Sequence, residues 1–169
     1  MTTENIKHWH AIYVSSRSEK KVCENLNRKS IEAYVPLVKT IRQWSDRKKK
    51  IELPLINGYV FVRINLSEKD KVLQTKSVVN FVKSQGAVAS IRDEEIERLK
   101  QLVELGYQME VGPISRINQG AKIKIMSGFL KGIEGIVIDA DGDKLIEVLL
   151  ESIGQCIRVK VPKEIISTL

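Results

Sequence analysis

The residue types that most often do chemistry are few in this chain of 169 residues, and they are scattered. His8 and His10 are two positions apart, so both imidazoles would lie on one face of a strand. A metal site needs further ligands at suitable spacing, and none stands near this pair. Packing or hydrogen bonding is therefore the better interpretation of both histidines, and the sequence predicts no metal ion and no cofactor.

Three carboxylates, Asp139, Asp141 and Asp143, surround a glycine and resemble the start of a calcium-binding loop. In an EF-hand the loop glycine would fall at Lys144 and the closing glutamate at Leu150, so the required residue types are missing. The acidic turn of a hairpin is the simpler interpretation. Because no acid, base and nucleophile cluster elsewhere in the chain, the sequence predicts a protein that is not an enzyme.

The net charge of +7 lies wholly in the first 118 residues, which hold 21 Lys and Arg against 14 Asp and Glu. Residues 119–169 hold seven of each. A basic surface of this kind predicts a polyanionic partner, with nucleic acid as the first candidate. The candidate nucleic-acid-binding residues are Arg17, Lys20, Lys21, Arg42, Arg47 and Lys48. A solvated run of charges is the alternative interpretation of residues 48–50.

Four aromatic residues, Tyr13, Tyr34, Tyr59 and Phe61, fall on segments that we expect to be neighbouring strands. The chain is only 5% aromatic, so four rings on one side of a sheet would form an apolar patch with polar tips. Such patches are typical of protein interfaces. The alternative is that the four rings form the domain core, and for Phe61 the two interpretations are balanced.

The elements that would position these residues follow an α+β pattern. Strands are expected at residues 9–14, 33–44 with a break at Pro36, 48–53, 58–64 and 78–82. Helices are expected from Ser18 to about Ser30, after the capping sequence 67–70, and from Asp93 to Gly106. This order predicts helices packed on a mainly antiparallel sheet, with a long basic hairpin in residues 33–53.

The last third of the chain has the pattern of consecutive short strands. We expect them at residues 121–126, 133–139, 144–150 and 155–161, separated by glycine-rich or acidic turns. Ten isoleucines and four valines in this part favour strand over helix, because branching at Cβ restricts side-chain freedom in a helix. Gly112 and Pro113 place a short linker between the two parts.

No segment of the sequence marks export or membrane insertion. No apolar run approaches the roughly 20 residues that span a bilayer, and the N-terminus lacks the apolar stretch of a signal peptide. Cys23 and Cys156 lie far apart, without the paired spacing of metal ligands, so free thiols are expected. The sequence predicts a cytoplasmic protein with no membrane partner.

Several short segments carry a resemblance to a known family. Glycine-punctuated stretches at residues 120–125, 128–132 and 135–138 resemble the KOW motif. Upstream lie Trp-His-Ala-Ile-Tyr-Val at 9–14, Tyr-Val-Pro at 34–36 and Pro-Leu-Ile-Asn-Gly-Tyr-Val-Phe-Val at 54–62. This order resembles the NusG family of transcription elongation factors, with specialised paralogues of the RfaH and UpxY type as the nearer subgroup. The resemblance extends from about Trp9 to the end of the chain.

The resemblance implies two domains and a non-enzymatic role in transcription elongation and antitermination. An NGN-type α/β sandwich would occupy residues 1–110, a linker 111–118, and a five-stranded SH3-like KOW barrel 119–169. In the family the NGN domain binds the clamp helices of the largest subunit of RNA polymerase. A ribosome-associated or RNA-binding KOW protein is the alternative function.

The resemblance also assigns roles to individual residues. It gives Tyr13, Tyr34, Tyr59 and Phe61 to polymerase binding. Arg17 and Lys21 match basic residues that face non-template single-stranded DNA in RfaH-like proteins. The KOW barrel would recruit ribosomal protein NusE or Rho, with Phe129 and Ile153 as the candidate contacts. Ile153 stands where general NusG carries phenylalanine, so Rho becomes the less certain of these two partners.

Overall fold

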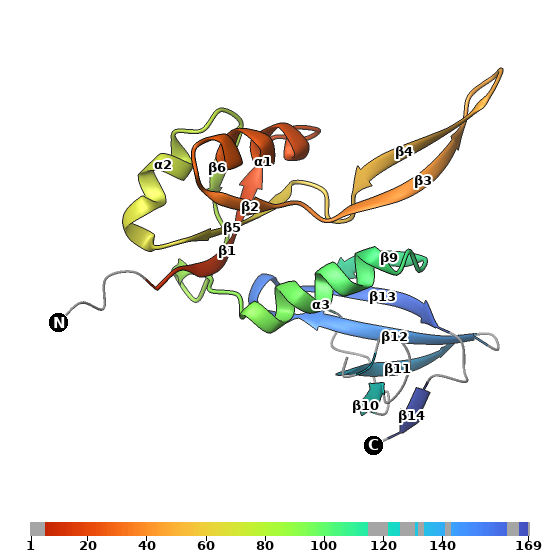
Figure 1. Cartoon of the computed structure of the whole chain (residues 1–169). Coiled ribbons are helices and arrows are strands. Elements are labelled where there is room, and N and C mark those ends of the chain that lie inside the picture. The colour runs from red at the N-terminus through yellow and green to blue at the C-terminus, as the bar shows by residue number, and fades with distance from the viewer. Residues whose placement is uncertain are drawn as a thin grey trace. The chain divides into compact units, whose positions relative to one another are not determined.

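The computed structural model describes residues 6–114, 122–125, 131, 134–140, 143–161 and 166–168. The chain divides into two compact units, Met1–Ile96 and Glu97–Leu169 (Figure 1). Antiparallel pairing joins the strands of both units. Among the described residues, two α-helices lie in the first unit, and a third begins in the first unit and ends in the second. The predicted α+β class is therefore confirmed. Within the described ranges, no helix has the length and apolarity that crossing a membrane requires.

The first unit is built on a four-stranded sheet. Its strands are β1 (His8–Val14), β2 (Glu32–Tyr34), β5 (Tyr59–Ile64) and β6 (Val78–Phe81). Its helices are α1 (Glu19–Arg28), the one-turn η1 (Leu66–Glu68) and α2 (Lys69–Leu73). The spatial order is β2-β5-β1-β6, so β5 and β1 are the two central strands. A two-stranded sheet of β7 (Lys83–Ser84) and β8 (Ala87–Val88) follows. Helix α3 (Asp93–Glu104) then begins at Asp93, as expected, and continues into the second unit.

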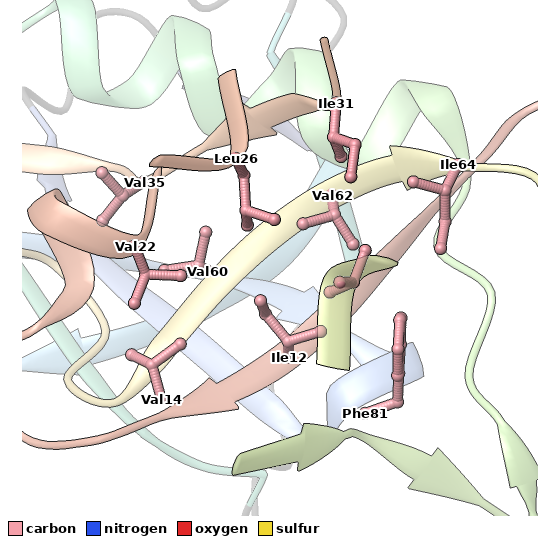
Figure 2. Packing of buried hydrophobic residues seen from close by; sticks show 11 residues of the cluster. Ile12, Val14, Val22, Leu26, Ile31, Val35, Val60, Val62, Ile64 and Phe81 are labelled. Atoms are coloured by element: carbon pink, nitrogen blue, oxygen red, sulfur yellow. The ribbon is translucent and has the colours of Figure 1, made fainter. Parts of the chain in front are cut away.

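The core of the first unit lies between α1 and one face of this sheet. Val22 and Leu26 are four positions apart on α1 and both are fully buried, so they share the helix face that meets the sheet. Figure 2 shows these two side chains beside Val60 and Val62 of β5. Fully burying an aliphatic side chain of this size contributes about 1.5–3 kcal/mol. The amphipathic spacing of α1 therefore fixes which face of the sheet is the core.

Two helix starts differ in detail from their sequence-based expectations. Ser18 precedes α1 as predicted, but its side chain makes no capping hydrogen bond. The buried Glu19 carboxylate instead accepts a hydrogen bond of 2.8 Å from the Gly58 amide, which ties α1 to the start of β5. The predicted capping sequence 67–70 is displaced as well, because Asn65 and Glu68 form the capping box, at the start of η1.

A long β-hairpin is the third feature of the first unit. It consists of β3 (Leu37–Gln43) and β4 (Lys48–Pro54), and among the described strands each pairs with the other alone. The break predicted at Pro36 separates it from β2. Figure 1 shows the hairpin projecting away from the four-stranded sheet, and all ten residues of 41–50 are exposed. The expected basic hairpin is therefore a projecting ribbon.

The second unit is a six-stranded antiparallel sheet. Its strands are β9 (Met109–Pro113), β10 (Lys122–Ile125), β11 (Glu134–Ala140), β12 (Asp143–Leu150), β13 (Gln155–Val161) and β14 (Ile166–Thr168). The order is β14-β10-β11-β12-β13-β9, and the turn η2 (Glu151–Ile153) joins β12 to β13. Among the described residues after 119 there are five strands, the number that the family resemblance implies.

The first of these strands, β9, was not expected from the sequence. It overlaps the predicted linker, because Val111 of β9 pairs with Ile157 of β13. Gly112 and Pro113 indicate a loop, but an edge strand has one unpaired side and accommodates a proline there. Residues 115–118 lie outside the described residues, and the domain limits 1–110, 111–118 and 119–169 stay a prediction.

A buried ion pair spans two central strands of the second unit. Glu147 of β12 is fully buried, and Arg158, opposite it on β13, donates a hydrogen bond of 2.7 Å from Nε to its Oε1. This hydrogen bond raises the pKa of Arg158.

Cys156 lies two residues away as a free buried thiol, and burial raises its pKa. The half-buried Cys23 is also free, with a pKa raised by burial, so neither thiol is activated as a nucleophile.

We expect Gly135 of β11 not to tolerate a side chain. A Cβ at this position would lie 2.5 Å from Ile146 Cγ2 and 2.7 Å from the Glu147 carbonyl oxygen. Overpacking typically costs about 1–3 kcal/mol, so Gly135→Ala should speed amide hydrogen exchange in β11 and β12 by roughly tenfold or more. Gly112→Ala is the matched control, because its Cβ would meet only Arg158 Nη1 at 3.6 Å. Wild-type exchange in Gly135→Ala would contradict this close approach.

The stability of the first unit should depend on the protonation of His10. This imidazole is 3% exposed, its Nδ1 lies 2.9 Å from the Ala89 carbonyl oxygen, and burial lowers its pKa below 6.5. The unfolded chain therefore binds the proton more readily than the folded chain. The free energy of unfolding should be greatest above about pH 7 and should fall as pH drops through 6.5 towards the lowered pKa.

Urea unfolding between pH 5 and pH 8 tests this expectation in the full chain. His10→Gln keeps a donor that can reach Ala89 but cannot be protonated, so its stability should vary less with pH than that of the wild type. His8→Gln, at an exposed position of the same strand, is the control and should keep the wild-type profile. Identical pH profiles for His10→Gln and the wild type would show that another group is responsible.

Candidate functional site

The second face of the four-stranded sheet carries all four predicted aromatic residues. Strand register places Tyr13 of β1 opposite Tyr59 of β5, and Tyr34 of β2 opposite Phe61 of β5. Side chains alternate along a strand, so Tyr59 and Phe61 share a face, and the core valines 60 and 62 share the other. Residues 13, 34, 59 and 61 therefore form one surface, the aromatic face.

The rings of the aromatic face are in contact in two pairs. The Tyr13 and Tyr59 ring centroids are 5.1 Å apart at an interplanar angle of 55°. The Tyr34 and Phe61 centroids are 6.4 Å apart at 27°. Aromatic pairs at such distances contribute about 0.5–1.5 kcal/mol beyond the area they bury. Each ring is therefore held in place before any partner arrives.

Exposure separates the members of the aromatic face. Tyr13 is 40% exposed, Tyr34 and Tyr59 are partly buried, and Phe61 is 1% exposed. The tyrosines can offer ring surface to a partner. The burial of Phe61 favours the core interpretation of this residue, and its role in polymerase binding stays a prediction.

A fixed cation lies beside the aromatic face, and sequence reasoning did not single it out. Arg63 follows Phe61 by two residues and is opposite the buried Trp9. Its Nη1 lies 3.7 Å from Glu32 Oε2, and its Nη2 lies 3.3 Å from Asp93 Oδ2. An apolar centre with charged groups beside it is the usual composition of a protein interface.

The basic residues at the start of α1 lie in and after the turn that follows β1. Arg17, Lys20 and Lys21 are all exposed. Arg17 has φ = 63°, a left-handed conformation that is uncommon for a residue with a side chain. Lys21 Nζ lies 3.6 Å from Glu24 Oε2, an exposed pair that competes weakly with other anions. This group, residues 17, 20 and 21, is the α1 basic cluster.

The other basic candidates lie on the projecting hairpin, where the structure adds a residue that sequence reasoning missed. Arg42, Arg47 and Lys48 are exposed as predicted. Trp44 stands in the turn between them and is 56% exposed. It is one of two tryptophans in the chain and has basic residues on both sides in the sequence, which is a signal that could have singled it out. Tryptophan is usually largely buried, so this exposure is informative.

Of the two candidate contacts in the second unit, Ile153 lies among the described residues. Ile153 ends η2 before Gly154, which has φ = 67°, and only 9% of Ile153 is exposed. Its side chain packs mostly inward. Phe129 lies outside the described residues. In the part of the chain that the structure describes, no three His, Cys, Asp or Glu side chains come together in a way that could hold a metal ion.

Comparisons with known proteins agree with this architecture. Residues 7–100 match the family model "Transcription termination factor nusG". The chain is 25% identical over 162 residues to the transcription termination/antitermination protein NusG of Streptococcus pyogenes serotype M1, covering 88% of each chain. It is 26% identical over 157 residues to the protein of that name from Lactococcus lactis, covering 81% of this chain and 80% of the relative.

A solved structure supports the same fold. The structure titled "Domain interaction in Thermotoga maritima NusG" matches with a TM-score of 0.58 and 23% identity, covering 96% of this chain and 97% of that one. Structural likeness at this identity establishes the fold. Since the family model spans more than half of the chain and the relatives cover most of it, this protein belongs to the NusG family.

Proposed function

We propose that this protein is a transcription elongation and antitermination factor that binds the clamp helices of the largest RNA polymerase subunit through its aromatic face. The observation that carries the proposal is the contact of Tyr13 with Tyr59, and of Tyr34 with Phe61, on the sheet face that α1 does not cover. Its curated relatives are termination/antitermination proteins, which supports the same assignment. The role is one of binding rather than catalysis, in the cytoplasm where a bacterial polymerase works.

The aromatic face has the properties that such a contact needs. Tyrosine can bury its ring against a partner while its hydroxyl stays in water or finds a hydrogen bond. The ring contacts hold the tyrosines in place, so little side-chain entropy is lost on binding. The ion pairs of Arg63 supply polar groups beside the apolar rings. A polymerase clamp held by this face would stay closed, and pausing and termination would become less frequent.

The α1 basic cluster is assigned to the non-template DNA strand. Arg17, Lys20 and Lys21 are exposed, and their turn follows β1 directly, four residues after Tyr13. A factor bound through Tyr13 would therefore carry these cations close to its polymerase contact. Phosphate contacts of this kind position a strand without reading its sequence.

The second unit is assigned to the recruitment of another factor, with ribosomal protein NusE or Rho as the candidates. The small exposed fraction of Ile153 offers a limited apolar contact at the end of η2. The match of the family model to residues 7–100 favours this polymerase-linked function over that of a ribosome-associated KOW protein. A protein of the alternative kind would copurify with ribosomal subunits and not with polymerase.

Tyr13→Ala should weaken binding to bacterial core RNA polymerase by roughly 30-fold or more. The reason is that interface tyrosines commonly contribute about 2 kcal/mol or more, and each 1.4 kcal/mol is about tenfold in affinity. Biolayer interferometry on the full chain measures the change. Tyr13→Phe keeps the ring and should retain most of the affinity.

Leu66→Ala is the matched control, because Leu66 is a large apolar residue with 52% exposure on η1, outside the aromatic face. Circular dichroism should show that all three variants are folded. Equal losses of affinity in Tyr13→Ala and Leu66→Ala, or none in either, would remove the aromatic face from the polymerase contact. Phe61→Ala is unsuitable here, since truncating a buried phenylalanine destabilises the sheet itself.

Charge reversal of the α1 basic cluster should weaken its binding to the non-template strand. In an assembled elongation complex, Arg17→Glu with Lys21→Glu should reduce crosslinking to that strand. The slope of log affinity against log salt concentration should become shallower by about 0.7 for each phosphate that the variant no longer neutralises. Lys83→Glu, which changes an exposed lysine of β7, is the control. Wild-type crosslinking and salt slope in the double variant would mean that the cluster is merely solvated.

A further inference from the structure

The end of the β3–β4 hairpin is an isolated ribbon of ten exposed residues, 41–50, which we call the hairpin tip. Three residue pairs hold its two strands in register, from Ile41 with Lys50 to Gln43 with Lys48. The turn beyond them is closed by a hydrogen bond of 2.8 Å from the Trp44 amide to the Arg47 carbonyl oxygen. The tip is therefore a defined structure that leaves both of its faces open to a partner.

Positive charge covers both faces of the hairpin tip. It contains five cations and one carboxylate, Asp46. Arg42 lies directly opposite Lys49 on one face, while Lys48 and Lys50 alternate to the other. Among the described residues, none of the five cations lies within ion-pair distance of a carboxylate. Like charges directly opposite each other destabilise a sheet, so the Arg42–Lys49 pair favours an anionic partner on its face, and Lys48 and Lys50 add positive charge on the other.

The hairpin tip also exposes two large apolar side chains. Trp44 in the turn is 56% exposed, and Ile41 at the base is 62% exposed. An indole at the leading end of a cationic ribbon is suited to nucleic acid, because it can pack against bases and sugars while the cations contact phosphates. Solvation of a basic loop does not by itself account for an exposed tryptophan.

We propose that the hairpin tip inserts into the major groove of a DNA duplex. The cations of its two faces contact the phosphates of the two groove walls, and Trp44 reaches the base edges. The proposal rests on the proposed function in taking DNA as the polyanion, but it requires neither polymerase binding nor the α1 basic cluster. It assigns to the tip a duplex site that is distinct from the single-stranded contact of Arg17 and Lys21.

The dimensions of the hairpin tip fit this groove. The major groove of B-form DNA is about 12 Å wide and about 8.5 Å deep, and it admits a two-stranded β-ribbon. Three paired positions at about 3.3 Å each extend roughly 10 Å, which is sufficient to carry the turn to the groove floor. The major groove of an RNA duplex is deep and narrow and excludes such a ribbon.

Intrinsic fluorescence of the full chain tests the proposal directly. The chain has two tryptophans, and Trp9 is 3% exposed, so a change on adding nucleic acid reports Trp44. A DNA duplex of about 20 base pairs should change the fluorescence saturably, at concentrations at least fivefold lower than one of its strands alone or the RNA duplex of the same sequence. Tighter or equal binding of the single strand or of the RNA duplex would overturn the major-groove assignment.

Two variants test the named residues, with a fluorescein-labelled DNA duplex and anisotropy as the readout. Trp44→Ala should weaken binding about tenfold, because it removes the apolar contact of the indole with the base edges. The double variant Arg42→Gln with Lys49→Gln removes a like-charge pair, so the fold should persist. Because the variant loses two phosphate contacts, its slope of log affinity against log salt concentration should be shallower by about 1.8. Lys83→Gln, an exposed lysine of β7, is the matched control and should bind as the wild type does.

The outcome is separable from that of the polymerase experiments. Wild-type duplex affinity and salt slope in both hairpin variants would overturn the proposal, whatever their affinity for polymerase. Weaker duplex binding by these variants, with polymerase binding retained, supports a separate duplex site. If instead the wild-type chain binds the duplex through Trp44 but does not bind polymerase, the proposed function fails and this inference stands.

Discussion

The antiparallel register between β1 and β5 is the constraint on which both faces of the first unit depend. It places Tyr13 opposite Tyr59 on one face and Ile12 opposite Val60 on the other. Because side chains alternate, a slip of one residue would bury the tyrosines against α1 and expose the aliphatic core. Burial of Ile12 and Val60 beneath α1 therefore keeps the tyrosines on the opposite face, where Tyr13 is 40% exposed. The binding surface is held in place by the core behind it.

Local contacts at the start of β5 secure this register. The Gly58 amide donates to the buried Glu19 carboxylate of α1, and the Gly58 carbonyl oxygen accepts from the Val14 amide at 2.9 Å. Gly58 has φ = 79°, a conformation that disfavours any residue with a side chain. One glycine thus joins the end of β1, the start of β5 and the first turn of α1. The α1 basic cluster and the aromatic face share this anchor.

Sequence patterns predicted the elements that depend on periodicity and missed those that depend on tertiary pairing. Alternation in β1 and β5, and the four-residue spacing of Val22 and Leu26, indicated the sheet, the helix and the shared face of the aromatic residues. Strand β9 was missed because Gly112 and Pro113 are loop signals, and only its pairing with β13 makes it an edge strand. The sequence did not predict side-chain burial either, because alternation places Phe61 with the tyrosines but does not show that Phe61 is buried.

The hairpin tip illustrates what composition alone leaves undetermined. The net charge indicated a polyanionic partner but not which cations are organised to meet it. The hairpin tip carries five cations and one carboxylate, a net charge of +4 in ten residues, which is more than half of the chain's total of +7. This charge lies on a ribbon remote from the core, where an unfavourable pair such as Arg42 and Lys49 weakens only the hairpin. The rigid sheet can therefore specialise in an apolar protein contact while the projecting ribbon concentrates the charge that a polyanion requires.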